Sequence, residues 1–109
     1  MPQATFVQVG QAIDYTPGSA VAAGDVVVQG DLVGVAKVPI AANKLGALHV
    51  DGVFDFAKNT GVAFTVGQIL YWDDTANQAT TTSAGNKQIG KCVRAAGTSD
   101  TTVRIRMSQ

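Results

Sequence analysis

Three side chains of types that bind metals or move protons stand close together in the sequence: His49, Asp51 and Asp55. Residues 46–56 alternate between apolar and polar types, so we expect one strand that carries all three on its polar face. Imidazole and carboxylate groups are metal ligands, but no further ligand follows at matching spacing. The alternation therefore favours a polar face turned towards solvent or a partner, and we predict no metal site here.

A second group of carboxylates is the pair Asp73 and Asp74. Carboxylate oxygens are the ligands that hard cations prefer. However, the pair follows a strand-like run and precedes Asn77, an order typical of a turn whose side-chain oxygens accept backbone hydrogen bonds. The sequence also lacks the Asp-x-Asp-x-Asp-Gly pattern of a calcium loop. We predict a turn.

Cys92 is the only cysteine, which excludes an internal disulfide. A nucleophilic thiol needs a base beside it, and the single histidine, His49, belongs to a different predicted strand. We therefore predict a buried structural thiol. The sequence shows no Ser-His-Asp set, no paired general acid and base, and no cofactor fingerprint. We expect neither an enzyme nor a bound cofactor.

The C-terminal third of the chain is basic. Alternation over residues 101–107 puts Arg104 and Arg106 on one face, where they could pair with carboxylates of a partner. The simpler alternative is that these charges protect an edge strand from aggregation. Eight acidic residues balance eight basic ones over the whole chain, so no net field attracts nucleic acid, and we predict none as a partner. The basic residues of this third are Lys87, Lys91, Arg94, Arg104 and Arg106.

The elements that position these side chains must be strands. All eight acidic residues are aspartate, and aspartate favours turns, whereas the missing glutamate favours helix interiors. Twelve glycines and many valines and threonines point the same way. We predict an all-β fold, either a small β-sandwich or a partly closed β-barrel of short antiparallel strands.

Turn residues divide the chain into the predicted strands. The Gly30-Asp31 pair predicts a hairpin, and the stretch from Gly67 to Gly90 predicts a three-stranded meander. Tyr71 and Trp72 should point to opposite faces of one strand in that stretch, so that one fills the core. The other strands are expected at 6–9, 12–16, 26–29, 32–38, 46–56, 62–66 and 101–107.

The 109 residues suit one domain. Residues 1–5 are small and polar, and we expect a flexible N-terminal arm followed by a single β domain over 6–109. The start of the chain shows no signal peptide, and no apolar run approaches the roughly 20 residues of a membrane span. We predict no membrane partner.

Several short motifs follow one another along the chain, at residues 23–28, 32–36, 52–55, 67–73, 85–90 and 100–106. Their order and spacing resemble those of a known phage family. The family was once a domain of unknown function, has carried the label of a predicted RecA-like recombinase, and is associated with capsid cement, or head decoration, proteins. A RecA-type ATPase needs a Gly-x-x-x-x-Gly-Lys-Ser/Thr loop, which this chain lacks, so the recombinase label fits poorly.

The resemblance implies a structural protein that binds the outside of a phage head and stabilises the shell. Its partners would be the major capsid protein and further copies of itself, as a homotrimer or otherwise a dimer. It would be made in the host bacterial cytoplasm and located on the virion head. The residues expected at capsid or subunit contacts are Pro2, Gln3, Phe6, His49, Asp51, Trp72, Arg104 and Arg106.

Two alternatives remain at this stage. One is a nucleic-acid-binding recombination accessory, as the older label suggests, which would show salt-dependent DNA binding. The other is a ligand-binding β-barrel module of a phage tail or baseplate, which glycan binding would reveal.

Overall fold

The computed structural model describes residues 3–6, 8 and 10–108. This part of the chain forms nine strands and no helix, which confirms the all-β prediction. It accordingly contains no helix that could cross a membrane. The strands are β1 Ala12–Tyr15, β2 Val26–Gln29, β3 Leu32–Val35, β4 Gly46–His49, β5 Gly52–Ala57, β6 Ile69–Asp73, β7 Gln78–Thr80, β8 Lys87–Arg94 and β9 Thr102–Met107.

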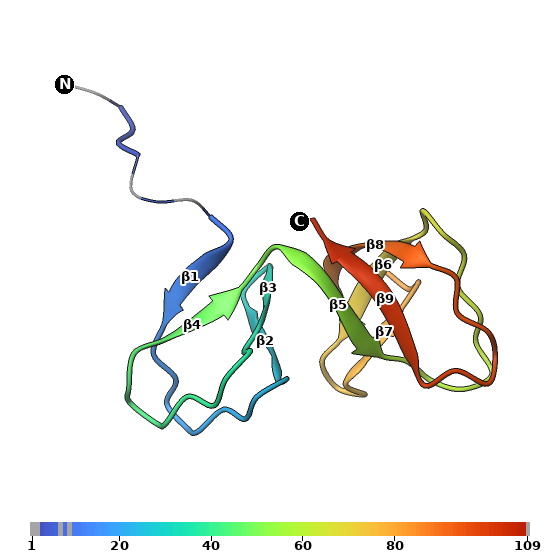
Figure 1. The fold of residues 1–109 in the computed structure, drawn as a ribbon, viewed down its shortest axis with the longest axis horizontal. Coiled ribbons are helices and arrows are strands. Elements are labelled where there is room, and N and C mark those ends of the chain that lie inside the picture. The colour runs from blue at the N-terminus through green and yellow to red at the C-terminus, as the bar shows by residue number, and fades with distance from the viewer. Residues whose placement is uncertain (1–2, 7, 9, 109) are drawn as a thin grey trace.

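The first four strands form one antiparallel sheet in the order β1-β4-β3-β2. The valine-rich strands β2 and β3 pair as the hairpin that the sequence predicts, and Gly30 adopts a φ of 59° in the connecting turn. β2 and β3 lie nearest the rest of the molecule, and β1 lies at the far end (Figure 1).

The remaining strands form a second antiparallel sheet in the order β5-β9-β8-β6-β7. The predicted meander over residues 67–90 is wrong, because β8 does not pair with β7. It crosses to the other edge of β6 and lies between β6 and β9. The eight-residue β8 buries Ile89, Gly90 and Cys92, and the buried backbone groups there find hydrogen-bond partners because β8 has a neighbour on each side.

The predicted single strand over residues 46–56 is also wrong. The chain leaves β4 after His49 and enters β5 at Gly52, which has a φ of 115°. The Gly52 N–H donates to Asp51 Oδ1 at 2.9 Å, which supports the bend. β4 pairs in the first sheet and β5 in the second, so this short break is where the chain passes between sheets.

One shorter prediction also differs from the structure, and another falls partly on residues that the structure does not describe. Residues 62–66 form no strand, and Phe64 makes only an isolated bridge to Ala96. The strand expected at 6–9 includes Val7 and Val9, which lie outside the described residues. Residues 3–6 are exposed and lead away from both sheets (Figure 1), while the division into an arm and a single domain stays a prediction.

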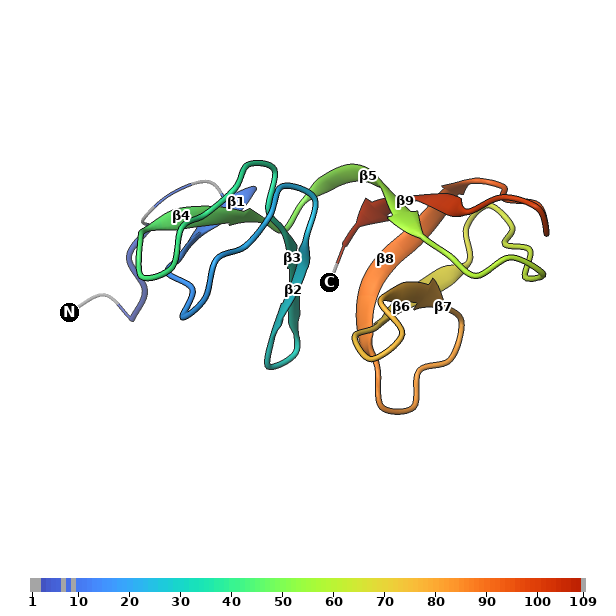
Figure 2. The same ribbon diagram turned by 90° about the horizontal axis from the view of Figure 1, so that it is seen from below.

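The main core lies where the two sheets meet. Val33 and Val35 of β3, with Val26 and Val28 of β2 beside them, pack against the inner face of the second sheet. Lys87 Nζ also contacts Asp31 Oδ1 at 2.6 Å, which links the hairpin tip to the start of β8. The sheets pack side by side along the long axis (Figure 2). Neither closes into a barrel, so the sandwich form of the fold prediction is the better description.

The second sheet is strongly curled. Its edge strands approach each other, and Lys58, just after β5, makes an isolated parallel bridge to Ala79 of β7. The inner face is lined by Leu70, Trp72, Ile89 and Ile105. The outer face is therefore the surface that this sheet presents to solvent.

Candidate functional site

The structure scatters most of the residues predicted to make contacts. Gln3 and Phe6 are exposed on the N-terminal segment, where the Phe6 side chain is 81% exposed. His49 is half-buried on β4, and Asp51 is exposed in the break after it. Pro2 lies outside the described residues. Only Arg104 and Arg106, both on β9, lie side by side as expected.

Trp72 belongs to the core. It is 5% exposed, its ring lies 5.9 Å from that of Phe56, and its Nε1–H donates to Asp74 Oδ1 at 3.2 Å. Tyr71 is half-buried on the opposite face of β6, so the expectation that the two rings point to opposite sides is confirmed. The Trp72 side chain therefore has almost no exposed surface with which to contact a capsid protein or another copy of the chain.

The groups considered for metal binding do not come together. His49 and Asp55 belong to different sheets, so the shared polar face predicted for them is wrong. No three His, Cys, Asp or Glu side chains gather as a metal site within the described residues. Asp73 forms the predicted turn, because its Oδ1 accepts hydrogen bonds from the N–H groups of Thr75 and Ala76 at 3.0 and 3.1 Å.

Cys92 is 1% exposed, as predicted for a structural thiol. Its Sγ donates to the Arg94 carbonyl oxygen at 3.1 Å. The contact accompanies a register shift between Cys92 and Arg94, which turns the Arg94 side chain outward.

Four cations share the outer face of the central strands β8 and β9. We name Lys91, Arg94, Arg104 and Arg106 the basic face. Lys91 lies directly opposite Arg106, and Arg94 lies directly opposite Arg104. The buried residues Val103, Ile105 and Met107 alternate with them along β9 and point inward, as the sequence predicts. The face thus concentrates half of the chain's eight basic residues.

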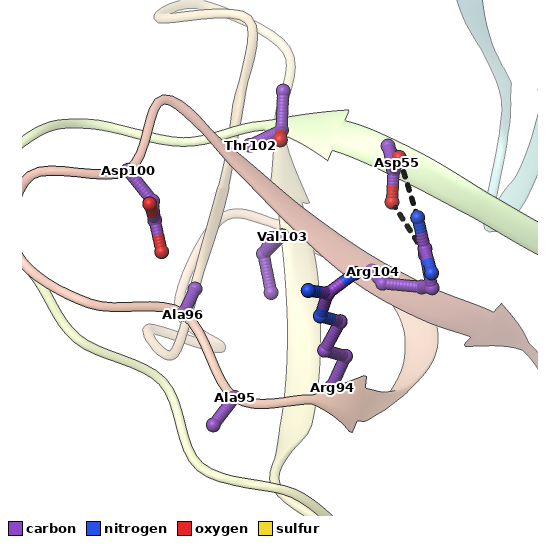
Figure 3. Close-up of a pocket in the computed structure, with 8 residues that line it drawn as sticks. All are labelled: Asp55, Arg94, Ala95, Ala96, Asp100, Thr102, Val103 and Arg104. Carbon is purple, nitrogen blue, oxygen red and sulfur yellow. Dashed lines mark hydrogen bonds and ion pairs between the residues drawn. The ribbon is translucent and has the colours of Figure 1, made fainter.

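A shallow hollow of about 200 Å³ adjoins the basic face, with Arg94, Arg104 and Asp100 among its walls (Figure 3). Arg104 bends towards β5, where its Nε and Nη2 donate to the two carboxylate oxygens of Asp55 at 2.9 and 3.2 Å. Arg94 extends from β8 towards Arg104. Asp100 Oδ2 accepts from the Gly97 N–H at 2.7 Å and holds the loop before β9.

The electrostatics of the hollow are set by these arginines. The hydrogen bond from Arg104 lowers the pKa of Asp55 below its usual value of 3.8, burial opposes that shift, and the charges of Arg104 and Arg94 add to it. Guanidinium groups stay protonated and match carboxylates geometrically. The arrangement therefore suits recognition of an anionic group.

The Asp55–Arg104 pair makes a prediction about pH. The Asp55→Asn variant should melt slightly below wild type near neutral pH, because it loses an exposed ion pair of small value. A carboxyl whose folded pKa is lowered stabilises the fold fully above its unfolded pKa, and this stabilisation is lost as the pH falls through the folded pKa. The gap in melting temperature should therefore close as the pH falls below about 3.8.

Calorimetric scans of both proteins at several pH values measure that gap. Asp14→Asn is the matched control, since it removes a carboxylate of β1 for which the described residues offer no ion pair. A gap for Asp55→Asn that persists unchanged into acid would show that the pair does not stabilise the fold.

The family model described as phage cement protein matches residues 7–107. The chain belongs to the phage cement protein family. The match covers both sheets and confirms the resemblance seen in the sequence motifs. No curated protein and no solved structure matches the chain.

Membership gives this cement protein a structural role in a phage and implies a location at the capsid. The family is a structural one and is not a known enzyme family. It also removes the main support for the recombination accessory, because that alternative rested on the older label.

Two residues of the basic face were missed as site candidates. Lys91 and Arg94 were noted in the sequence only as part of a basic segment. Their position opposite Arg106 and Arg104 depends on which strands pair and on the shift after Cys92. The sequence offered only the three-residue spacing between Lys91 and Arg94 as a guide to their faces. Simple alternation along a strand would put them on opposite faces, so this spacing could not reveal the basic face.

Proposed function

We propose that this protein is a head decoration protein that binds the outer surface of the phage capsid and stabilises the shell. The observation that carries the proposal is the match of the phage cement family over residues 7–107. The partner would be the major capsid protein, and copies of the chain would associate as a homotrimer or otherwise a dimer. The protein would be made in the host bacterial cytoplasm and end on the virion head surface.

The structure supports this proposal through its rigid framework. The core fixes two sheets as one scaffold, which can present the same surface to every capsid subunit. Phe6, Leu45 and Val38 are 81%, 70% and 64% exposed, but single exposed apolar side chains are common on protein surfaces and do not identify a contact. Weak contacts suffice for such a protein, because a symmetric shell repeats each contact and association between copies multiplies its effect.

The experiment uses heads from a phage that lacks this gene. Purified protein mixed with those heads should co-sediment with them, and a reconstruction by electron cryo-microscopy should show added density on the outer surface. Heads that have bound it should release their DNA at a higher temperature than bare heads. Heads that already carry the protein serve as the control and should take up little more. Bare heads that stay bare at saturating protein would contradict the proposal.

A further inference from the structure

The basic face has an unusual register. In antiparallel strands, residues directly opposite each other have neighbouring side chains on the same face, and like charges there destabilise the pair. Both cross-strand positions at the centre of the second sheet hold such pairs, Lys91 with Arg106 and Arg94 with Arg104. Neither pair is needed for packing, because the core side chains point to the other face.

Among the residues that the structure describes, a single ion pair offsets this repulsion. Asp55 is the carboxylate beside these pairs, and Arg104 holds both of its oxygens. The side chains of Lys91, Arg94 and Arg106 make no hydrogen bond or ion pair to any residue that the structure describes. These three cations are exposed, so their donors are free for a partner.

Aliphatic side chains border the cations. Val53 of β5 lies opposite Arg106, and Ile69 of β6 lies opposite Lys91, so one row across four strands runs valine, arginine, lysine, isoleucine. Val53 is 55% exposed, and Ile69 is 43% exposed. Val93, at the register shift, is 41% exposed. Arginine is enriched at the centre of protein–protein interfaces, and neighbouring apolar side chains can exclude water from its charge once a partner binds.

We infer that the basic face docks onto a carboxylate-rich protein surface of the phage capsid. This inference rests on the proposed function and names the part of the chain that performs it. Carboxylates of the capsid bind Arg94, Arg106 and Lys91, and they relieve the repulsion that the free chain carries. The hollow beside Arg94 admits an acidic side chain next to the occupied Asp55–Arg104 pair.

The partner's chemistry follows from the face as a whole. Single-stranded nucleic acid is bound by basic surfaces with aromatic side chains on which bases stack, and duplex DNA by surfaces whose excess of cations neutralises several phosphates. The basic face is bordered by valine and isoleucine and contains a carboxylate, and the chain has no net charge. Acidic protein side chains match this mixture better than a phosphate backbone does.

The test uses a variant that inverts both pairs, Lys91→Glu with Arg94→Glu. Each new glutamate faces an arginine, so two repulsive pairs become attractive ones. The matched control is Lys37→Glu with Lys44→Glu, which makes the same change in charge at exposed positions of the other sheet's loops. Lys37 Nζ lies 5.8 Å from the centre of the Phe54 ring, so the control is compared with wild type in its binding and not in its melting temperature. Binding to gene-deleted heads is measured by co-sedimentation over a range of salt concentrations, and thermal unfolding is followed for every protein.

We expect the inverted variant to melt about 2–6 °C above wild type and to bind heads at least about tenfold more weakly. Wild-type binding should weaken as salt is added, and the control should bind like wild type. If these residues only supported the fold, the inverted variant would lose stability and binding together. A higher melting temperature combined with weaker binding therefore distinguishes a docking role from a structural one. If the inverted variant fails to fold, Lys91→Gln with Arg94→Gln removes the same charges and should show the same loss of binding.

Five results would overturn the inference. The first is an inverted variant that binds heads as tightly as wild type. The second is a control that loses as much binding as the inverted variant, because binding would then depend on net charge alone. Wild type could bind a fluorescent DNA duplex at physiological salt through these residues. Light scattering could show that the inversion separates an oligomer, which would make the face a contact between copies. Heads that bind no wild-type protein at all would refute the proposed function itself, and the inference with it.

Discussion

Gly90→Ala should destabilise the protein by at least about 3 kcal/mol, and lower its melting temperature by about 10 °C or more. A Cβ at this position would overlap the Arg106 carbonyl oxygen and would lie 2.8 Å from the Ser108 nitrogen. Both obstacles are backbone atoms of β9 and its end, so no side-chain rotation can make room.

The cost is high because of where Gly90 lies. It pairs with Met107 in the middle of the second sheet, and the Ser108 N–H donates to the Ile89 carbonyl oxygen at 3.0 Å next to it. Relieving the overlap means separating β8 from β9, and these two strands carry Ile89, Ile105 and Met107 into the core. Overpacking is tolerated where a side chain can shift, but here a backbone ladder must open.

Chemical and thermal unfolding followed by circular dichroism measures this effect. Gly18→Ala is the control, because no atom lies within 4 Å of its added Cβ and its φ is not positive. Its free energy of unfolding should stay within about 0.5 kcal/mol of wild type. A Gly90→Ala protein as stable as the control would mean that β8 and β9 do not approach as closely as the structure has them.

The sequence predicted the elements that depend on neighbours in the chain. Alternation placed Arg104 and Arg106 outside and Val103 inside, and turn residues located the β2–β3 hairpin and the Asp73 turn. Each of these follows from preferences over a few residues. These predictions could be correct without any information about which distant strands pair.

Predictions failed where distant segments decide the outcome. Alternation continues without interruption through Val50 and Asp51, so it could not show that Gly52 takes a positive φ and starts a second sheet. β7 is only three residues long, so it cannot cover the buried β8, which pairs with β6 and β9 instead. The basic face depends on the same non-local pairing, and for that reason only half of it was recognised as a site.

Lys58 shows the same limit at a single residue. The sequence 58–61 has the composition of an exposed turn, yet the Lys58 side chain is 6% exposed. Its ammonium donates to three backbone carbonyl oxygens, those of Asn59 at 2.9 Å, Gly97 at 3.1 Å and Asp100 at 2.8 Å. The same group lies 5.8 Å from the centre of the Phe64 ring. All three donors of the lysine are therefore used.

These bonds fasten the loop before β9 to the end of β5. Gly97 and Asp100 belong to that loop, and Asp100 also lines the hollow beside Arg94. A buried charge is stable only when its hydrogen bonds are complete, and the carbonyl oxygens gain from a charged donor. Lys58 thus holds in place one wall of the surface that we propose meets the capsid.

Lys58→Met should therefore cost about 3 kcal/mol or more, since it keeps the length of the stem but leaves three carbonyl oxygens without their donor. Denaturant unfolding gives this value, and amide hydrogen exchange should show the loop at 97–100 opening first. Lys44→Met, at an exposed lysine, is the matched control and should change stability by less than about 0.5 kcal/mol. Equal stability of the two variants would mean that water replaces the ammonium without loss, and that the loop is held by Asp100 and the β9 ladder alone.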